Sequence, residues 1–258
     1  EGGKILGGIL KKVVAMVRPG VTTMELDQHA EQEIRVSGGR PAFKGYCVEG
    51  VKTPFPATIC TSINDVVVHG IPRKDATLQE GDIIGIDIGM EWPYTTNGQR
   101  RGFYTDMALT VGVGFIREKD VLLLRETRHA LDKGICVVKP GGYVGDIGAA
   151  VSAHLKKYKF GIIRELAGHG TGYQLHEEPL IPNVGVRGSG VVLKEGMVIA
   201  IEPMATVGGH HIIVDDDEWT IRTRDGSRAA HFEQTVAVTH DGATVLTPFF
   251  DEVDLEHM

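Results

Sequence analysis

The sequence predicts an α+β fold made of two duplicated halves. A ten-residue pattern occurs twice, at 78–87 and 193–202: Leu-x-Glu-Gly, a variable residue, two apolar residues, a small residue, Ile and a carboxylate. The sequence Val-x-Pro-Gly also occurs twice, at 17–20 and 138–141. In each half, helix-like periodicity comes before strand-like runs, an order typical of helices packed on one face of an antiparallel sheet.

Four helices are expected, one before and one after each Val-x-Pro-Gly sequence. Thr22 and Glu25 form the capping-box pattern at the start of the second helix. Pro-Gly is a signal that ends the helix before it. The expected helices span roughly 4–17, 23–36, 119–137 and 145–158.

Apolar runs rich in branched residues predict strands after these helices. In the first half the expected strands cover 58–69, 83–90 and 106–113, and in the second half 161–166, 198–204, 219–223 and 232–238. Residues 90–104, which include Pro93, Asn97 and Gly98, are predicted to form a loop or hairpin insertion.

The sequence contains no boundary between the two halves. Its 258 residues, 42% hydrophobic and 24% charged, are ordinary for a soluble globular protein with a large core. No low-complexity segment or long linker interrupts them. We therefore expect a single domain, residues 1–258, with a site between two halves, roughly 1–115 and 116–250, that are related by a pseudo-two-fold axis.

Composition excludes several classes of function. A net charge of -7 and a pI of about 5.9 lack the basic footprint of a nucleic-acid-binding protein. Three cysteines with no Cys-x-x-Cys pair make neither a disulfide framework nor a cysteine zinc site, which favours a reducing compartment. The chain shows no signal-peptide pattern and no apolar stretch long enough to span a bilayer. We therefore expect a cytoplasmic protein with neither nucleic acid nor a membrane as a partner.

Four acidic residues lie at strand positions that match across the repeat. Asp87 and Glu202 end the two copies of the ten-residue pattern, and Asp106 and Glu233 lie at the starts of later strands. A single acid of this kind would be interpreted as a turn cap or an ion-pair partner. Four acids on buried strands cannot stay ionised together without cations, so the two matched pairs indicate a metal site.

Histidines add to this predicted site. His169 lies in Ala-Gly-His-Gly-Thr-Gly, and an imidazole with carboxylates but no thiolate suits Mn, Fe, Co or Zn. Four carboxylates would balance two divalent ions, and paired ions that lower the pKa of a bridging water to about 7 recur in hydrolases. His69 and His176 are candidates to bind a substrate amide there, although each alone would be interpreted as a structural histidine. The other eight histidines are interpreted as ordinary structural or surface residues.

Longer motifs resemble the methionine aminopeptidases. They are Ile-Cys-Thr-Ser-Ile-Asn-Asp-Val-Val-Val-His-Gly-Ile-Pro at 59–72, Gly-His-Gly-Thr-Gly at 168–172, His-Glu-Glu-Pro at 176–179 and Ile-Glu-Pro-Met at 201–204. The resemblance extends over essentially the whole chain. Because the chain has neither a long N-terminal extension nor a large insertion in its second half, we expect the type I form. The family has the pita-bread α+β fold, which agrees with the repeat.

The resemblance implies a metal-dependent hydrolase that removes the initiator methionine from peptides and nascent proteins, with the ribosome as a further partner. The residues that would hold two divalent ions (Co, Mn, Fe or Zn) are Asp87, Asp106, His169, Glu202 and Glu233. Asp106 and Glu233 would bridge both ions. Asp87 would bind one ion, and His169 with Glu202 the other. A metal-bridged hydroxide would attack the carbonyl with Glu202 as proton shuttle, while His69 and His176 polarise the scissile amide.

The same resemblance assigns Phe55, Cys60 and Trp219 to the pocket for the methionine side chain. Residues 43–54 depart from the family pattern, and an insertion at 91–101 lengthens the spacing between the first two acids. Two alternatives are a prolidase or Xaa-Pro aminopeptidase of the same fold and a non-enzymatic module that binds peptides. The His-Gly-Ile-Pro sequence favours the methionine enzymes over the first, and the complete set of metal-binding residues argues against the second.

Overall fold

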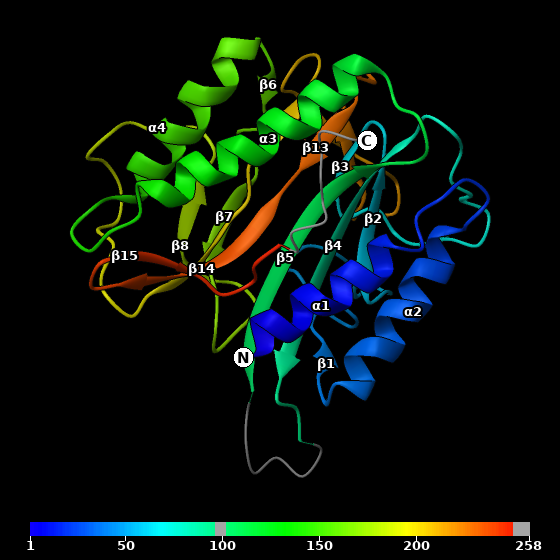
Figure 1. Cartoon of the computed structure of the whole chain (residues 1–258), viewed down its shortest axis with the longest axis horizontal. Coiled ribbons are helices and arrows are strands. Elements are labelled where there is room, and N and C mark those ends of the chain that lie inside the picture. Colours follow the sequence, from blue (N-terminus) through cyan, green and yellow to red (C-terminus); the bar gives the residue numbers. More distant parts are fainter. Residues whose placement is uncertain (96–101, 250–258) are drawn as a thin grey trace.

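A nine-stranded antiparallel sheet forms the centre of the protein, which a computed structural model describes for residues 1–95 and 102–249. The strands follow the order β1-β4-β5-β14-β9-β7-β8, with β2 paired to β4 and β15 paired to β14. Helices α1 and α2 lie against the first half of one face of this sheet, and α3 and α4 lie against the second half (Figure 1). Two three-stranded sheets, β13-β10-β6 and β11-β12-β3, complete the described part of the fold. The predicted α+β fold class is confirmed.

In each half of the chain the first two elements are helices and most strands come after them, as the sequence predicts. The helices are α1 (Gly2–Val14), α2 (Thr23–Val36), α3 (Glu118–Cys136) and α4 (Val144–Leu155), with a 3₁₀ turn at Lys156–Tyr158. The central strands are β1 (Arg40–Pro41), β2 (Ile59–Ile63), β4 (Ile83–Trp92), β5 (Phe103–Gly112), β7 (Ala167–Gly170), β8 (Glu177–Pro182), β9 (Val198–Ile201), β14 (Glu233–Thr239) and β15 (Gly242–Val245). The smaller sheets contain β3 (Val66–Val68), β6 (Gly161–Ile162), β10 (Met204–Thr206), β11 (Ile212–Val214), β12 (Ile221–Thr223) and β13 (Ala229–His231). Within the described residues, no helix has the length and apolar character needed to cross a membrane.

Alternation of side chains along the central strands separates a helix-covered face from a second face. In β4, Ile86 and Ile88 are fully buried in the main hydrophobic core, and Asp87 between them therefore points to the other side of the sheet. In β5, Met107 and Leu109 belong to the same core. The acids of the repeat therefore lie on the face of the sheet that the helices leave uncovered.

The strand order and matched hydrogen bonds reveal the duplication. In the order β4-β5-β14-β9, strand β5 of the first half lies beside β14 of the second, so the pseudo-two-fold axis runs between these two strands. The N–H of Gly20 donates to the carbonyl of Leu78, and the N–H of Gly141 donates to the carbonyl of Leu193, both at 2.9 Å. Each Val-x-Pro-Gly sequence therefore pairs with the ten-residue pattern of its own half.

Several expected elements are shorter or divided, for local reasons. The first helix ends at Val14 rather than at 17, and the helix expected at 145–158 gives way to a 3₁₀ turn after Leu155. The strand expected at 58–69 forms β2 and β3, because the chain turns at Asn64, where φ is 55°. The strand expected at 198–204 divides into β9 and β10 at Pro203, which has no N–H to donate to a neighbouring strand.

The remaining differences concern short strands and the insertion. The strand expected at 161–166 is reduced to the two residues of β6, and β7 and β8 form where no strand was expected. Strand β4 continues to Trp92 and β5 begins at Phe103, so the base of the expected insertion is an antiparallel hairpin. Residues 96–101 lie outside the described part of the chain. The capping box of Thr22 and Glu25 is present.

Asp27 joins α2 to the central sheet, and its loss is expected to destabilise the fold. Its buried Oδ1 accepts hydrogen bonds from the backbone N–H groups of Thr58 at 2.7 Å and Ile59 at 3.0 Å. An unsatisfied buried polar group costs about 1–3 kcal/mol, so Asp27→Ala should lower the free energy of unfolding by about 2–4 kcal/mol in chemical denaturation. Asp27→Asn keeps the accepting oxygen and should cost less. Wild-type stability of the alanine variant would contradict this anchoring role.

Candidate active site

One row of side chains crosses the uncovered face of the central sheet. The strand register pairs Cys60 with Asp87, Asp87 with Ala108, and Ala108 with Glu233. Continuing the register of β14 and β9 by one residue puts Glu202 opposite Glu233. Residues that lie opposite each other in antiparallel strands share one face. The small side chain of Ala108 therefore leaves room between carboxylates from both halves of the chain.

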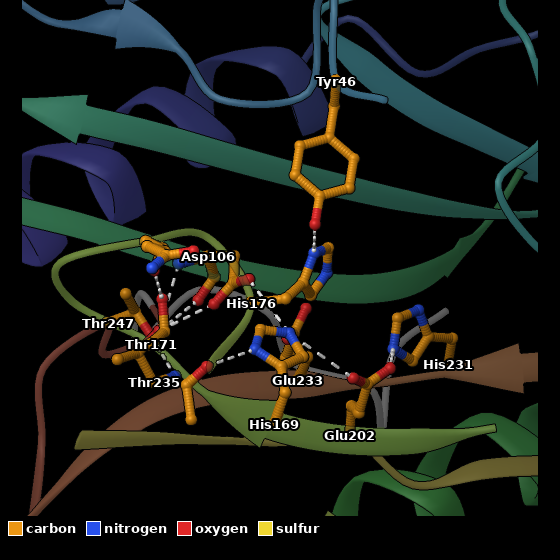
Figure 2. A network of polar contacts seen from close by, with 12 residues as sticks. Tyr46, Asp106, His169, Thr171, His176, Glu202, His231, Glu233, Thr235 and Thr247 are labelled. Atoms are coloured by element: carbon orange, nitrogen blue, oxygen red, sulfur yellow. Dashed lines mark hydrogen bonds and ion pairs between the residues drawn. The ribbon is translucent and has the colours of Figure 1, made fainter. Parts of the chain in front are cut away.

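Asp106 and His169 extend this row into a cluster. Asp106 lies two residues before Ala108 on β5 and so faces the same side, where the hydroxyl group of Thr235 donates to its Oδ1 at 3.1 Å. The Nε2 atom of His169 is 3.3 Å from Oδ2 of Asp106. The same Nε2 atom is 3.8 Å from Oε1 of Glu202 and 3.9 Å from Oε1 of Glu233 (Figure 2).

A cavity of about 100 Å³ opens onto this cluster. Its lining contains every residue that the sequence nominated for the site: Asp87, Asp106, His169, Glu202 and Glu233 for metal ions, His69 and His176 for the substrate amide, and Phe55, Cys60 and Trp219 for the methionine side chain. The cavity is also lined by Phe43, Tyr46, Val48 and Leu175, which were not nominated. The fold therefore brings together residues that are spread over most of the sequence.

Burial and mutual repulsion shift the ionisation of the clustered groups. Burial raises the pKa of Asp87 to about 7, and although His231 opposes this shift, Asp106 and Glu202 add to it. Burial and the neighbouring acids also raise the pKa of Glu233 well above its usual range. Burial would lower the pKa of the His169 imidazole, but Asp106 and Glu202 raise it to about 9. The buried acids therefore cannot all ionise together without a compensating cation, an arrangement that favours the binding of cations.

The donor atoms of the cluster fit divalent metal ions. Ligand atoms of Asp106, His169 and Glu233 lie within 4.8 Å of one another. Nδ1 of His169 is 2.9 Å from the carbonyl oxygen of Gly170, which can only accept, so Nδ1 carries a proton and Nε2 faces the acids. Among the described residues, Oδ1 of Asp87 is buried and has no hydrogen-bond partner. An imidazole nitrogen, several carboxylates and no thiolate suit Mn, Fe, Co or Zn.

His69 and His176 lie where the cavity meets a wider groove, which both residues also line. His69 follows β3 with a φ of 58°, a left-handed conformation that is uncommon for residues other than glycine. Burial lowers the pKa of His69 to about 4, so its ring is neutral at pH 7 and carries one N–H. Nδ1 of His176 is 2.6 Å from the hydroxyl oxygen of Tyr46, and burial followed by the charge of His169 lowers its pKa (Figure 2).

The apolar side of the cavity is a separate hydrophobic cluster. Phe55, Cys60 and Trp219 are buried there together with Phe43 and Leu175. The rings of Phe55 and Trp219 meet edge to face with centroids 5.2 Å apart. Burial raises the pKa of the Cys60 thiol well above its usual range, so this sulfur is a neutral, apolar lining group.

Besides the apolar lining residues, sequence reasoning missed two polar residues of the site, Tyr46 and His231. Tyr46 lies in the stretch that departs from the family pattern, and only the folded loop brings its hydroxyl group to His176. His231 was interpreted as an ordinary histidine, but it is buried with Nε2 3.3 Å from Oε2 of Glu202. Its position two residues before Glu233 is the signal that the sequence offers.

This fold and this cluster of ligands define a metallopeptidase: the chain belongs to metallopeptidase family M24, which matches residues 1–240. Relatives about 40% identical over nearly the whole chain are methionine aminopeptidases. The methionine aminopeptidase of Clostridium acetobutylicum is 40% identical over 247 residues, which are 96% of this chain and 93% of that protein. Methionine aminopeptidase 1 of Bacillus subtilis is 40% identical over 96% of this chain and 94% of its own length. The crystal structure of methionine aminopeptidase from Rickettsia prowazekii has a TM-score of 0.87 and 38% identity, covering 95% of this chain and 94% of that chain.

Prolidases share the architecture at a greater distance. The prolidase structure from Pyrococcus horikoshii has a TM-score of 0.74 and 21% identity, covering 97% of this chain and 61% of that chain. At this identity the similarity shows the pita-bread fold alone. Sequence identity therefore places the chain with the methionine aminopeptidases.

Proposed function

We propose that this chain is a metal-dependent aminopeptidase that removes the N-terminal methionine from peptides and nascent proteins. The observation that carries the proposal is a single cavity in which the metal-binding cluster, two histidines and a buried apolar pocket meet. Relatives named methionine aminopeptidase, 40% identical over 96% of the chain, support the same reaction. One catalytic domain would span the chain.

The five clustered ligands would hold two divalent ions of Co, Mn, Fe or Zn. Asp106 comes from β5 and Glu233 from the neighbouring strand β14, where the two halves of the chain meet. This central position supports a role for both carboxylates as ligands shared by the two ions. Asp87 would bind one ion, and His169 with Glu202 the other. When bound, such ions lower the pKa of water to about 7 and polarise a carbonyl group.

The side chains around this centre would move the proton and orient the scissile amide. Glu202 would take the proton of the attacking water and return it to the nitrogen of the leaving peptide. His69 is neutral at pH 7 and would donate its N–H to the carbonyl oxygen of the amide. His176 borders the same groove and would contact the amide in an orientation held by Tyr46.

The shape of the cavity would select the first residue of a chain. The buried side chains of Phe55, Cys60 and Trp219 would surround the methionine side chain. The α-amine would lie beside Asp87, so that only an amino-terminal residue could occupy the pocket. The remainder of the peptide would leave through the wider groove beyond the two histidines. Nascent chains on ribosomes in the cytoplasm would be the cellular substrates, and neither nucleic acid nor a membrane is an expected partner.

A panel of peptides tests the proposed activity. The purified chain, supplied with Mn²⁺, should release methionine from Met-Ala-Ser and Met-Gly-Ser peptides and should leave Ala-Pro and Gly-Pro peptides uncut. Removal of the metal with a chelator should abolish release, and addition of Mn²⁺, Co²⁺, Fe²⁺ or Zn²⁺ should restore it to different extents. Preferred cleavage of the Xaa-Pro peptides would overturn the proposal in favour of a prolidase.

A further inference from the structure

The backbone of His231 is held in place by two neighbouring strands. His231 ends β13, where it is paired with Met204 of β10. Its N–H donates to the hydroxyl oxygen of Thr110 on β5 at 2.9 Å, and that hydroxyl group lies 2.9 Å from its carbonyl oxygen. Because three strands meet at this residue, the position of the His231 ring is set by the sheets rather than by a loop.

The ring of His231 contacts the carboxylate oxygen of Glu202 that lies away from His169. Nε2 of His231 is 3.3 Å from Oε2 of Glu202, while the other carboxylate oxygen of Glu202 is 3.8 Å from Nε2 of His169. Figure 2 shows Glu202 between these two imidazoles. Among the described residues, Nε2 of His231 is buried without a hydrogen-bond partner, and His231 is absent from the linings of both the cavity and the wider groove.

We propose that His231 is a positioning residue: its buried Nε2, 3.3 Å from Oε2 of Glu202, donates a hydrogen bond to that oxygen once Glu202 binds a metal ion and so directs Oε1 toward the metal site. The inference rests on the proposed function, which makes Glu202 a metal ligand. The two oxygens of a carboxylate are equivalent by chemistry, and a donor on one of them makes the other the ligand. Groups that hold ligands in this way typically contribute 10- to 100-fold to metal affinity or activity, which sets the size of effect to expect here at about that range.

The test compares two substitutions of similar size at this position. His231→Leu removes the donor, and His231→Gln keeps an amide N–H that reaches about as far as Nε2. Titration of the metal-free protein with Mn²⁺ by calorimetry should give an affinity about 10- to 100-fold weaker in the leucine variant, largely restored in the glutamine variant. With saturating Mn²⁺, kcat for a Met-Ala-Ser peptide should fall in the leucine variant while KM stays near that of the wild type.

A matched control is available outside the cavity. His154 is also buried beside a carboxylate, with Nε2 2.8 Å from Oε2 of Glu126. Glu126, His129 and His154 lie close enough together to hold an ion of their own, but His154→Leu should leave unchanged the Mn²⁺ affinity that supports peptide cleavage. If His231→Leu does not fold, His231→Asn serves in its place, because its shorter amide stops near the position of Nδ1 and cannot reach Glu202.

The outcomes separate this inference from the proposed function. Wild-type Mn²⁺ affinity in the leucine variant would overturn it. Equal loss in the leucine and glutamine variants would also overturn it, since the ring would then act as a ligand or as packing and not as a donor. The Mn²⁺ titration uses no substrate, so failure of the wild type to cleave methionine peptides would reject the proposed function and leave the titration result standing.

Discussion

Replacing Glu202 with glutamine is expected to lower kcat for a Met-Ala-Ser peptide by about 10²- to 10⁴-fold at saturating Mn²⁺, the range that general acid–base groups contribute. The amide retains the size of the side chain and one weak ligand oxygen, but it cannot accept the proton of the attacking water. The measurement is kcat at several Mn²⁺ concentrations, so that weaker metal binding is separated from slower chemistry. A near-wild-type kcat at saturating metal would remove Glu202 from the proposed proton transfer.

The same variant makes a prediction for the metal-free protein. Glu202 is one of the acids whose charge raises the pKa values of Asp87 and Glu233. Removing that charge relieves repulsion in the cluster, so the thermal midpoint of the chelated variant should not fall below that of the chelated wild type. A control is Glu126→Gln, which alters another buried glutamate outside the cavity that contacts Arg125 and His154. This control should lose stability and keep its activity.

The metal-binding acids could be predicted because each lies in or beside an apolar run typical of a buried strand, at positions that match across the repeat. Asp87 lies between Ile86 and Ile88, and a strand with isoleucine on one face must present the carboxylate on the other. The repeated pattern then implied that Glu202 occupies the equivalent place in the second half. The register in the structure agrees with this, since both acids lie in the same row across the sheet.

Other parts of the site depend on tertiary structure that local patterns do not encode. Strand β7 carries His169 but consists of Ala-Gly-His-Gly, and glycine is depleted in strands, so no strand was expected there. The strand expected at 198–204 is interrupted at Glu202 and Pro203, so that carboxylate lies between β9 of the central sheet and β10 of a smaller sheet. His231 reaches Glu202 through the pairing of β13 with β10, and Tyr46 reaches its histidine partner through a loop. These contacts come from segments without periodicity and so could not be predicted from the sequence.

Replacing His69 with alanine is expected to lower kcat by about 10²- to 10³-fold, the usual effect of removing one donor to a developing oxyanion. Because His69 is not among the side chains whose ligand atoms cluster for a metal ion, the Mn²⁺ affinity should stay at the wild-type value. The KM should change little, since the donor acts most strongly when negative charge develops on the carbonyl oxygen. Calorimetric titration with Mn²⁺ and steady-state kinetics on the same preparation measure all three quantities, and an unchanged kcat would exclude His69 from the reaction.

The backbone at His69 provides a matched variant that separates catalysis from folding. Its φ of 58° costs about 1–2 kcal/mol for a residue with a Cβ atom and little for glycine. His69→Gly should therefore be more stable than His69→Ala by about 1 kcal/mol in chemical denaturation, and both variants should lose the same factor in kcat. If activity instead followed stability between the two variants, the loss would arise from the turn after β3. Equal loss in two variants of different stability would assign the effect to the imidazole ring, which the fold holds in a strained conformation at the junction of the cavity and the groove.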